Sequence, residues 1–387
     1  MQQRWRIVGV HALVDDGLAA DTALGIDGDV IADIDAPAAG VRELRFDGLL
    51  ALPGIIDLHG DAFERQLMPR PGVFFADDLA LLDTDRQLAA NGVTTAYHGL
   101  TWSWEPGLRG TERAHAMAEA LDRLRPQLAC DTRLHLRWET YNLDVVPDVM
   151  QWLDAGRIHL LAFNDHTPPM LARLDDAATL LKYAERGGTT VTAFRDLLRS
   201  VGARHGAVPA AIATLAGHAG RLGVPLASHD DETPAQRAAL HALGCTLCEF
   251  PKNRETAQAA RATGDHVLMG APNVVRGGSH LGGVSAAALI GDGICDVLTS
   301  DYYYPALLHA PFRLARDHGS DVGRFWPLVS AQPARAAGLR DRGTLQPGRR
   351  ADLILVDARD GQWPRVVATV VAGRIVHHDR RADTLAA

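Results

Sequence analysis

Lysine is almost absent from this chain of 387 residues. Only Lys182 and Lys252 are lysines among 39 basic residues, and the others are arginine. The chain is not basic overall, because its formal net charge is -8 and its isoelectric point is near 6.1. This acidic balance argues against nucleic acid, or an anionic membrane surface, as a general partner.

Cysteine and long apolar runs are also scarce. Four cysteines, at positions 130, 245, 248 and 295, are too few for a disulfide framework in a chain of this size. Cys245 and Cys248 have the spacing of a redox or zinc pair, but they start an apolar strand pattern and no second pair matches them, so we interpret them as structural. There is no run of 18 apolar residues and no apolar leader pattern at the N-terminus, so we expect a cytoplasmic protein without a membrane span.

What the chain does contain is a regular alternation of apolar strand patterns and amphipathic helix patterns. Strands are expected at 54–59, 93–99, 133–139, 158–164, 224–229, 246–250, 266–269 and 297–300. Helix patterns, for example at 77–91, 206–222 and 233–243, separate them. This count predicts an α/β fold, a (β/α)₈ TIM barrel. A doubly wound sheet is the alternative, but no glycine-rich phosphate fingerprint follows the first strand.

Both ends of the chain read differently, as short strands separated by turns. The patterns WRIVGVHALV and VRELRFDGLLALPG precede the barrel, and ADLILVD and VVATVVAGRIVHHD follow it. We therefore expect a small β-sandwich domain built from residues 1–52 and 345–387, and a barrel domain over residues 53–344.

Metal-ligand residue types stand where the predicted barrel strands end. They are His59, Asp61, Glu139, His166, His229 and Asp301. Catalytic groups of barrel enzymes gather at these strand ends, and imidazole and carboxylate groups are ligands for Zn²⁺, Mn²⁺ or Fe²⁺. His59 and Asp61 are two residues apart, so they can face one ion if the strand extends that far. The pattern predicts a metal-dependent hydrolase.

Several longer motifs give this pattern a family resemblance. They are PGIIDLHGD at 53–61, PRPGV at 69–73, NDHTPP at 164–169, SHDDET at 228–233, HVLMGAPNVVRGGSH at 266–280, SDYY at 300–303 and the closing PARAAGLRDRGTLQPGRRADLILVD. Together they resemble the amidohydrolase superfamily over nearly the whole chain, and most closely its diphosphatases of phosphonate metabolism. The HGD triplet departs from the HTD expected there.

The resemblance implies one or two divalent metal ions, zinc first and manganese or iron as alternatives, held by the six residues above. Many members of the superfamily bridge two ions with a carboxylated lysine. Lys182 lies in a helix pattern and Lys252 follows its strand too late in the order, so Glu139 is the expected bridge. If Glu139 is not a ligand, we expect a single ion.

The resemblance also implies an activity: release of pyrophosphate from a ribose 1-methylphosphonate 5-triphosphate by a metal-activated water that attacks the α-phosphorus. Asp301 is the expected catalytic base. Binding of this small anionic substrate is assigned to Arg65, Arg70, Lys252, Arg276 and His280, which lie in loops after strands. Arginine suits phosphate because its guanidinium group can donate two parallel hydrogen bonds.

A metal-dependent hydrolase of C–N bonds, such as a cyclic amidase, deacylase or deaminase, is the alternative. It shares the metal ligands and differs in needing few cations around the substrate. Trp102 and Trp104 could stack on an aromatic substrate or pack their loop. Homo-oligomers are common among such barrels, but the sequence offers no interface signal.

Overall fold

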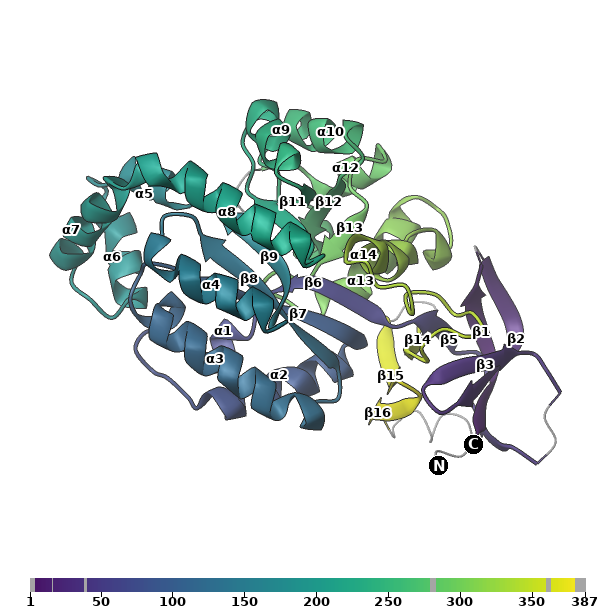
Figure 1. The fold of residues 1–387 in the computed structure, drawn as a ribbon. Coiled ribbons are helices and arrows are strands. Elements are labelled where there is room, and N and C mark those ends of the chain that lie inside the picture. The colour runs from purple at the N-terminus through teal and green to yellow at the C-terminus, as the bar shows by residue number, and fades with distance from the viewer. Residues whose placement is uncertain (1–3, 16, 38–39, 279–282, 360–362, 380–387) are drawn as a thin grey trace.

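The computed structural model describes residues 4–15, 17–37, 40–278, 283–359 and 363–379. Its larger part is an eight-stranded parallel sheet rolled into a barrel, with helices outside it (Figure 1). The barrel strands are β6 (Ile55–Gly60), β7 (Val93–Trp102), β8 (Asp131–Glu139), β9 (Ile158–Asn164), β10 (Leu226–His229), β11 (Cys245–Glu249), β12 (His266–Gly270) and β13 (Val297–Thr299). Neighbours in the chain are neighbours in the barrel, and a parallel bridge from Gly60 to Asp301 joins its first and last strands. The predicted barrel is confirmed.

The helices between the strands are short to medium in length. They are α1 (Glu64–Leu67), α2 (Asp77–Ala90), α3 (Thr111–Leu124), α4 (Val146–Asp154), α5 (Thr167–Leu171), α6 (Ala177–Arg186), α7 (Val191–Gly202), α8 (Val208–Arg221), α9 (Pro234–Ala242), α10 (Arg254–Ala262), α11 (Ala271–Arg276), α12 (Ala286–Gly291), α13 (Ala306–Asp317) and α14 (Ala331–Ala336). Capping side chains mark the start of some of these helices. Thr233 and Asn253 accept hydrogen bonds from backbone N–H groups in the first turns of α9 and α10. None of the described helices combines the length and apolar content needed to cross a membrane.

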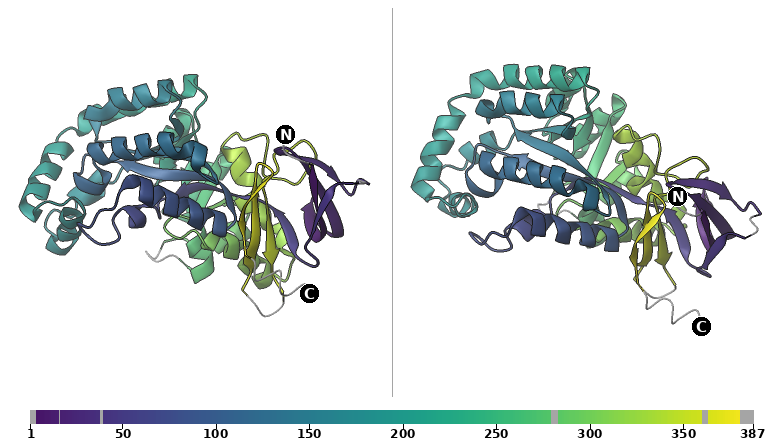
Figure 2. Two further views of the ribbon diagram at one scale, coloured as in Figure 1. Left: turned by 90° about the horizontal axis from the view of Figure 1, so that it is seen from below. Right: turned by 60° about the horizontal axis from the view of Figure 1, so that its bottom comes forward.

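A second sheet is formed by both ends of the chain. Its strands are β1 (Trp5–Val14), β2 (Gly17–Asp27), β3 (Val30–Ile34), β4 (Arg42–Arg45), β5 (Leu50–Pro53), β14 (Leu353–Asp357), β15 (Arg365–Val371) and β16 (Arg374–His378). The order is β16-β15-β14-β5-β1-β2-β3, with β4 beside β1, so the antiparallel pair β14 and β5 joins the two ends. Figure 2 shows these purple and yellow strands side by side in both views, at the side of the barrel opposite α6 and α7.

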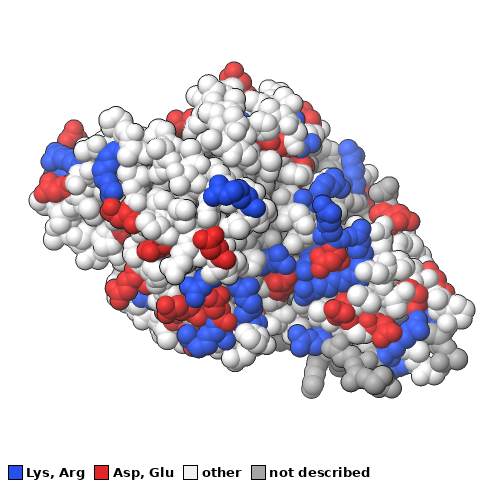
Figure 3. All heavy atoms as spheres, viewed as in Figure 1, with Lys and Arg blue, Asp and Glu red and all other residues white. Residues whose placement is uncertain are grey.

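The apolar core is divided into several buried clusters, one of them in the terminal sheet and one inside the barrel. A buried cluster takes residues from seven barrel strands: Ile56, Leu58, Tyr97, Leu160, Ala162, Ala227, Leu247, Leu268 and Val297. All four cysteines are buried, and none forms a disulfide bond. Cys245 and Cys248 lie in β11, which agrees with their interpretation as structural residues. On the surface seen in Figure 3, acidic and basic side chains are interspersed, with a basic group near the junction of barrel and terminal sheet.

Candidate metal centre

A cavity of about 690 Å³ opens where the barrel strands end. Six of the residues that line it are of metal-ligand type: His59, Asp61, Glu64, His229, Asp230 and Asp301. His59 is the last residue but one of β6, and His229 is the last residue of β10. Asp301 lies two residues beyond the end of β13. The carboxyl ends of neighbouring parallel strands meet at one rim, so residues far apart in sequence converge here.

The ligand-type atoms form three overlapping groups. In each group one atom per residue lies within 4.8 Å of the others; the groups are His59, Asp61 and Asp301; His166, His229 and Asp230; and His59, His229 and Glu249. Five of the six predicted ligands belong to these groups. The sixth, Glu139, does not.

The two histidines shared between groups are held neutral. His59 and His229 are buried, and this burial lowers the pKa of each ring to about 3. A neutral imidazole can offer a lone pair to a metal, whereas a protonated one cannot. Burial, followed by the nearby Asp61 carboxylate, raises the pKa of Asp301 to about 7.

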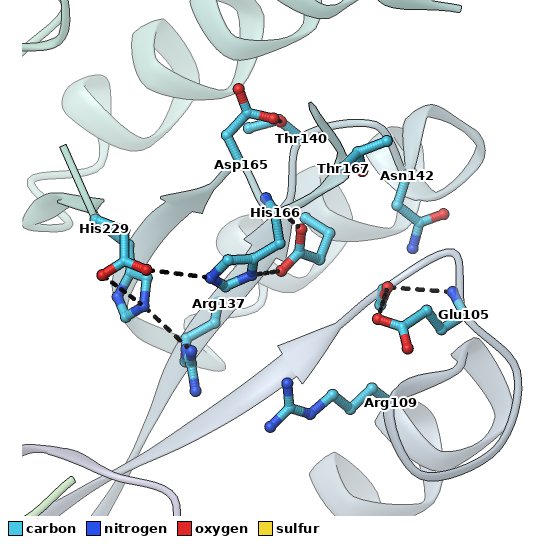
Figure 4. Close-up of polar contacts among 12 residues, drawn as sticks. Glu105, Arg109, Arg137, Thr140, Asn142, Asp165, His166, Thr167 and His229 are labelled. Atoms are coloured by element: carbon cyan, nitrogen blue, oxygen red, sulfur yellow. Dashed lines mark hydrogen bonds and ion pairs between the residues drawn. The ribbon is translucent and has the colours of Figure 1, made fainter. Parts of the chain in front are cut away.

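Glu139 contacts His166. Its Oε1 lies 2.6 Å from His166 Nδ1, and its Oε2 accepts from the backbone N–H of His166 at 3.3 Å. Burial lowers the pKa of His166, but the Glu139 and Asp230 carboxylates together outweigh this effect and raise the pKa to about 9. The other ring nitrogen, Nε2, lies 3.6 Å from Asp230 Oδ2. In Figure 4 His166 therefore lies between two carboxylates, beside His229. The role of Glu139 as a bridging ligand stays a prediction.

Three non-glycine residues at the strand ends adopt left-handed backbone conformations. They are Asp230, Phe250 and Asp301, with φ of 61°, 52° and 53°. Each still donates its backbone N–H to the neighbouring strand, for example Asp301 to His59 O at 2.9 Å. Such conformations cost about 1–3 kcal/mol and concentrate at functional sites. All three residues line the cavity.

Four cationic side chains also line the cavity: Arg65, Arg109, Arg137 and Lys252. Arg65 and Lys252 were predicted to bind the substrate. Arg70 and Arg276, predicted for the same role, are exposed and are not among the lining residues. The remaining predicted residue, His280, lies outside the described residues.

Each of these cations already has a partner. Arg109 donates two hydrogen bonds of 2.9 Å to the Glu64 carboxylate, and Arg137 donates one of 3.0 Å to Asp61. Lys252 Nζ lies 2.5 Å from Asp230 Oδ2. The Arg65 guanidinium donates to the backbone carbonyl of Tyr302.

Comparison with known proteins then gives the family. No family model matched the chain. The α-D-ribose 1-methylphosphonate 5-triphosphate diphosphatase of Escherichia coli is 33% identical over 326 residues, which cover 81% of this chain and 85% of that protein. This chain belongs to the amidohydrolase superfamily. Within that superfamily, the motifs predicted a relationship to the diphosphatases of phosphonate metabolism. The match to the Escherichia coli protein confirms this relationship.

Solved amidohydrolase structures share the fold. Dihydropyrimidinase from Brevibacillus agri superposes with a TM-score of 0.67 at 14% identity, covering 98% of this chain and 96% of its own. N-acetyl-D-glucosamine-6-phosphate deacetylase from Mycobacterium smegmatis gives a TM-score of 0.61 at 20% identity, covering 96% of this chain and 100% of its own. At these identities the likeness concerns the fold.

The donor set of this amidohydrolase fits a divalent ion. Members of the superfamily are metal-dependent, and the chain places neutral imidazoles and carboxylates together in a buried site.

Four residues of the site were not predicted: Arg109, Arg137, Asp230 and Glu249. Two had a signal in the sequence. Arg137 stands two residues before Glu139 on the same strand, so both side chains leave the strand on one side. Glu249 is a lone carboxylate at the end of an apolar strand, the pattern that identified the other ligands. Arg109 ends a one-turn 3₁₀ helix and Asp230 lies just beyond β10, and at such positions spacing does not determine the direction of a side chain.

The two tryptophans considered for substrate stacking do not line this cavity. Trp102 is fully buried against Trp152, and its Nε1 donates to Thr111 Oγ1 at 3.1 Å. Trp104 packs against Phe194. The structure therefore favours the loop-packing alternative.

Proposed function

We propose that this amidohydrolase releases pyrophosphate from α-D-ribose 1-methylphosphonate 5-triphosphate. The observation that carries the proposal is the coexistence, in one cavity, of four cationic side chains with the metal-ligand residues. The family relationship supports the same substrate, since the Escherichia coli relative bears that activity in its name.

The charge balance of the cavity suits a polyanion. Its four cations stand against four acidic side chains, Asp61, Glu64, Asp230 and Asp301, and its two histidines are neutral. One or two divalent ions would make the net charge positive. A volume of about 690 Å³ also lies within the usual range of about 300–1,000 Å³ for sites that bind small molecules.

The residues divide into ligands, a base and phosphate-binding groups. His59, Asp61, His229 and Asp301 would hold the metal, which when bound acts as a Lewis acid and makes a water more acidic. Water attacks the α-phosphorus, the bond from that phosphorus to the oxygen bridging it to the β-phosphorus breaks, and pyrophosphate leaves. The water's proton passes to the Asp301 carboxylate, which lines the cavity close to His59 and Asp61. Arginine and lysine donors stabilise the charge that develops on the phosphates.

Hydrolysis of a C–N bond is the second candidate, and one observation favours it. Three of the cavity's four cations form hydrogen bonds or ion pairs with carboxylates, and Arg70 and Arg276 are exposed outside it. Paired cations offer less attraction to a phosphate chain. The solved relatives above carry the names of enzymes that hydrolyse such bonds.

The deciding experiment is ³¹P NMR of protein loaded with Zn²⁺ or Mn²⁺, with the ribose triphosphate as substrate and ATP as comparison. Pyrophosphate release that a chelator abolishes supports the proposal. No release from protein shown to hold metal, together with turnover of a dihydropyrimidine, would move the assignment to C–N bonds.

Arg65 and Arg70 provide a matched pair for the binding step. Both are exposed arginines, Arg65 in the short helix α1 and Arg70 in the segment that follows it, but only Arg65 lines the cavity. We expect Arg65→Met to raise KM for the triphosphate about tenfold, equivalent to about 1.4 kcal/mol, and Arg70→Met to leave it within twofold. Equal effects would show that the cavity lining does not select the phosphate-binding arginine.

A further inference from the structure

A fully buried carboxylate lies behind the two cavity-lining histidines. Glu249, the last residue of β11, has no exposed surface and is not among the residues that line the cavity. Its Oε2 lies 3.1 Å from His59 Nδ1 and 3.3 Å from His229 Nδ1. The two imidazoles therefore contact Glu249 through Nδ1 and themselves line the cavity.

The partners of His229 determine which ring nitrogen carries its proton. A carboxylate only accepts hydrogen bonds, so the contact with Glu249 requires the proton on Nδ1. At the other nitrogen, Nε2, the guanidinium group of Arg137 approaches to 3.4 Å, and guanidinium only donates. Both contacts favour the same tautomer, with the proton on Nδ1 and the lone pair on Nε2. Figure 4 shows Arg137 pointing toward His229 from below.

A third histidine closes the cluster without competing for the carboxylate. His135 Nδ1 lies 3.0 Å from the carbonyl oxygen of Leu58, which can only accept, so this nitrogen carries the proton. The other nitrogen, Nε2, lies 3.8 Å from Glu249 Oε1 and has no proton to donate. The carboxylate is left to His59 and His229.

We propose that Glu249 is a positioning residue, which holds both histidines with Nδ1–H toward the barrel interior and Nε2 toward the metal. The proposal rests on the metal centre of the proposed function but not on the identity of the substrate. A carboxylate behind a ligating imidazole orients the ring and makes its lone pair more basic, and losing one typically weakens metal binding 10- to 100-fold. One carboxylate serving two rings would couple the orientation of both.

Metal affinity is the first test, because it needs no substrate. Glu249→Gln keeps the size of the side chain, but its uncharged amide oxygen is a weaker acceptor than the carboxylate, and its NH₂ group can only donate. We expect Zn²⁺ affinity, measured by competition with a chromophoric chelator, to fall at least tenfold. Glu249→Asp retains an acceptor and should recover part of the loss. Unchanged affinity in Glu249→Gln would overturn the proposal.

Asp265 offers a matched control. It is also a buried carboxylate in contact with a histidine Nδ1, at 2.9 Å from His241, but neither residue lines the cavity. Asp265→Asn should lower thermal stability while Zn²⁺ affinity stays within threefold of the natural protein. An equal loss of affinity in both variants would mean that Glu249 acts only through general stability.

Histidine NMR separates a positioning role from direct ligation by Glu249. In protein labelled with ¹⁵N-histidine and loaded with ¹¹³Cd²⁺, we expect cadmium coupling at Nε2 of His59 and His229 and a protonated Nδ1 in both. Cadmium coupling at Nδ1 would place the metal beside Glu249 and refute the proposal. Because no substrate enters, a protein that passes this test and yet releases no pyrophosphate would contradict only the proposed function.

Discussion

Arg342 joins the barrel to the terminal sheet, and its replacement should have a large effect on stability. It lies between α14 and β14 and is 6% exposed. Its guanidinium donates to Asp131 at 2.6 Å, to Asp341 at 2.9 Å through two nitrogens, and to Thr95 Oγ1 at 2.9 Å. Asp352, just before β14, lies 3.8 Å away. One side chain thus connects the amino ends of two barrel strands to the segment leading into the second sheet.

The loss of folding stability expected for Arg342→Met depends on which contacts its partners keep. Breaking a buried ion pair costs about 3–5 kcal/mol because a charge is left without its partner. Here Asp131 keeps contacts with Arg133 and Arg350, and Asp341 is half exposed, so we reduce the expectation to about 2–3 kcal/mol. With an unfolding entropy of about 2.1 cal/mol/K per residue, 387 residues convert this loss to about 3 °C in Tm.

The assay is urea denaturation followed by tryptophan fluorescence, together with a thermal scan. Arg340→Met is the control, since Arg340 is exposed two positions away, and it should change stability by less than about 0.5 kcal/mol. A double-mutant cycle with Asp131→Asn should give a coupling of about 1 kcal/mol. Metal content should not change, since Arg342 contacts the ends of β7 and β8 opposite the metal centre. If Arg342→Met matches Arg340→Met, the reasoning about this connection is refuted.

Three further outcomes follow from the site and its surroundings. Asp301→Asn should lower turnover at least 100-fold while the other ligands keep much of the metal, as measured by mass spectrometry; retained activity would exclude Asp301 as the base. Removing the metal should lower Tm by about 3 °C, because a ligand at 100 times its Kd stabilises by about 2.7 kcal/mol, and an unchanged Tm would contradict a metal centre. Burial lowers the pKa of His98 to about 4, below the value of about 6.5 in an unfolded chain, so the folded state binds the proton less well. Stability is therefore lost as pH falls from 6.5 toward 4, by about 2–3 kcal/mol at pH 4.5; His98→Asn should show a smaller decline in its urea midpoint, and an equal decline would refute this.

Regular patterns in the sequence were sufficient to predict the barrel. Each barrel strand is an apolar run bounded by turn residues, and the structure places all eight within a few residues of their predicted positions. The terminal sheet shows the same: the pattern VVATVVAGRIVHHD, expected to contain short strands and a turn, forms β15 and β16, and Ala372 and Gly373 between them have φ of 47° and 71°. Local chemistry determines these elements, so a single sequence suffices.

The same reasoning could predict the ligand types but not their partners. His59 and His229 stand at strand ends, and barrel geometry brings strand ends together whatever the side chains are. Whether Arg70 or Arg109 faces the cavity depends on how two loops fold back, which no periodicity encodes. The exposed loop carries Arg70 away, whereas Arg109 is held in place by its two hydrogen bonds to Glu64.

The pairing of cations with carboxylates explains how the cavity can hold so many charges before anything binds. Arg137 connects Asp61 to His229, so the same guanidinium compensates a carboxylate and keeps a lone pair directed into the cavity. Without it, Asp61 would lose its hydrogen-bonded cation while it lies close to Asp301, and burial of like charges is unfavourable. A metal ion supplies the same compensation more strongly and would free the guanidinium for a phosphate oxygen. The paired cations of the cavity are therefore compatible with phosphate chemistry, and the test that separates it from C–N hydrolysis is the behaviour of the metal-loaded protein.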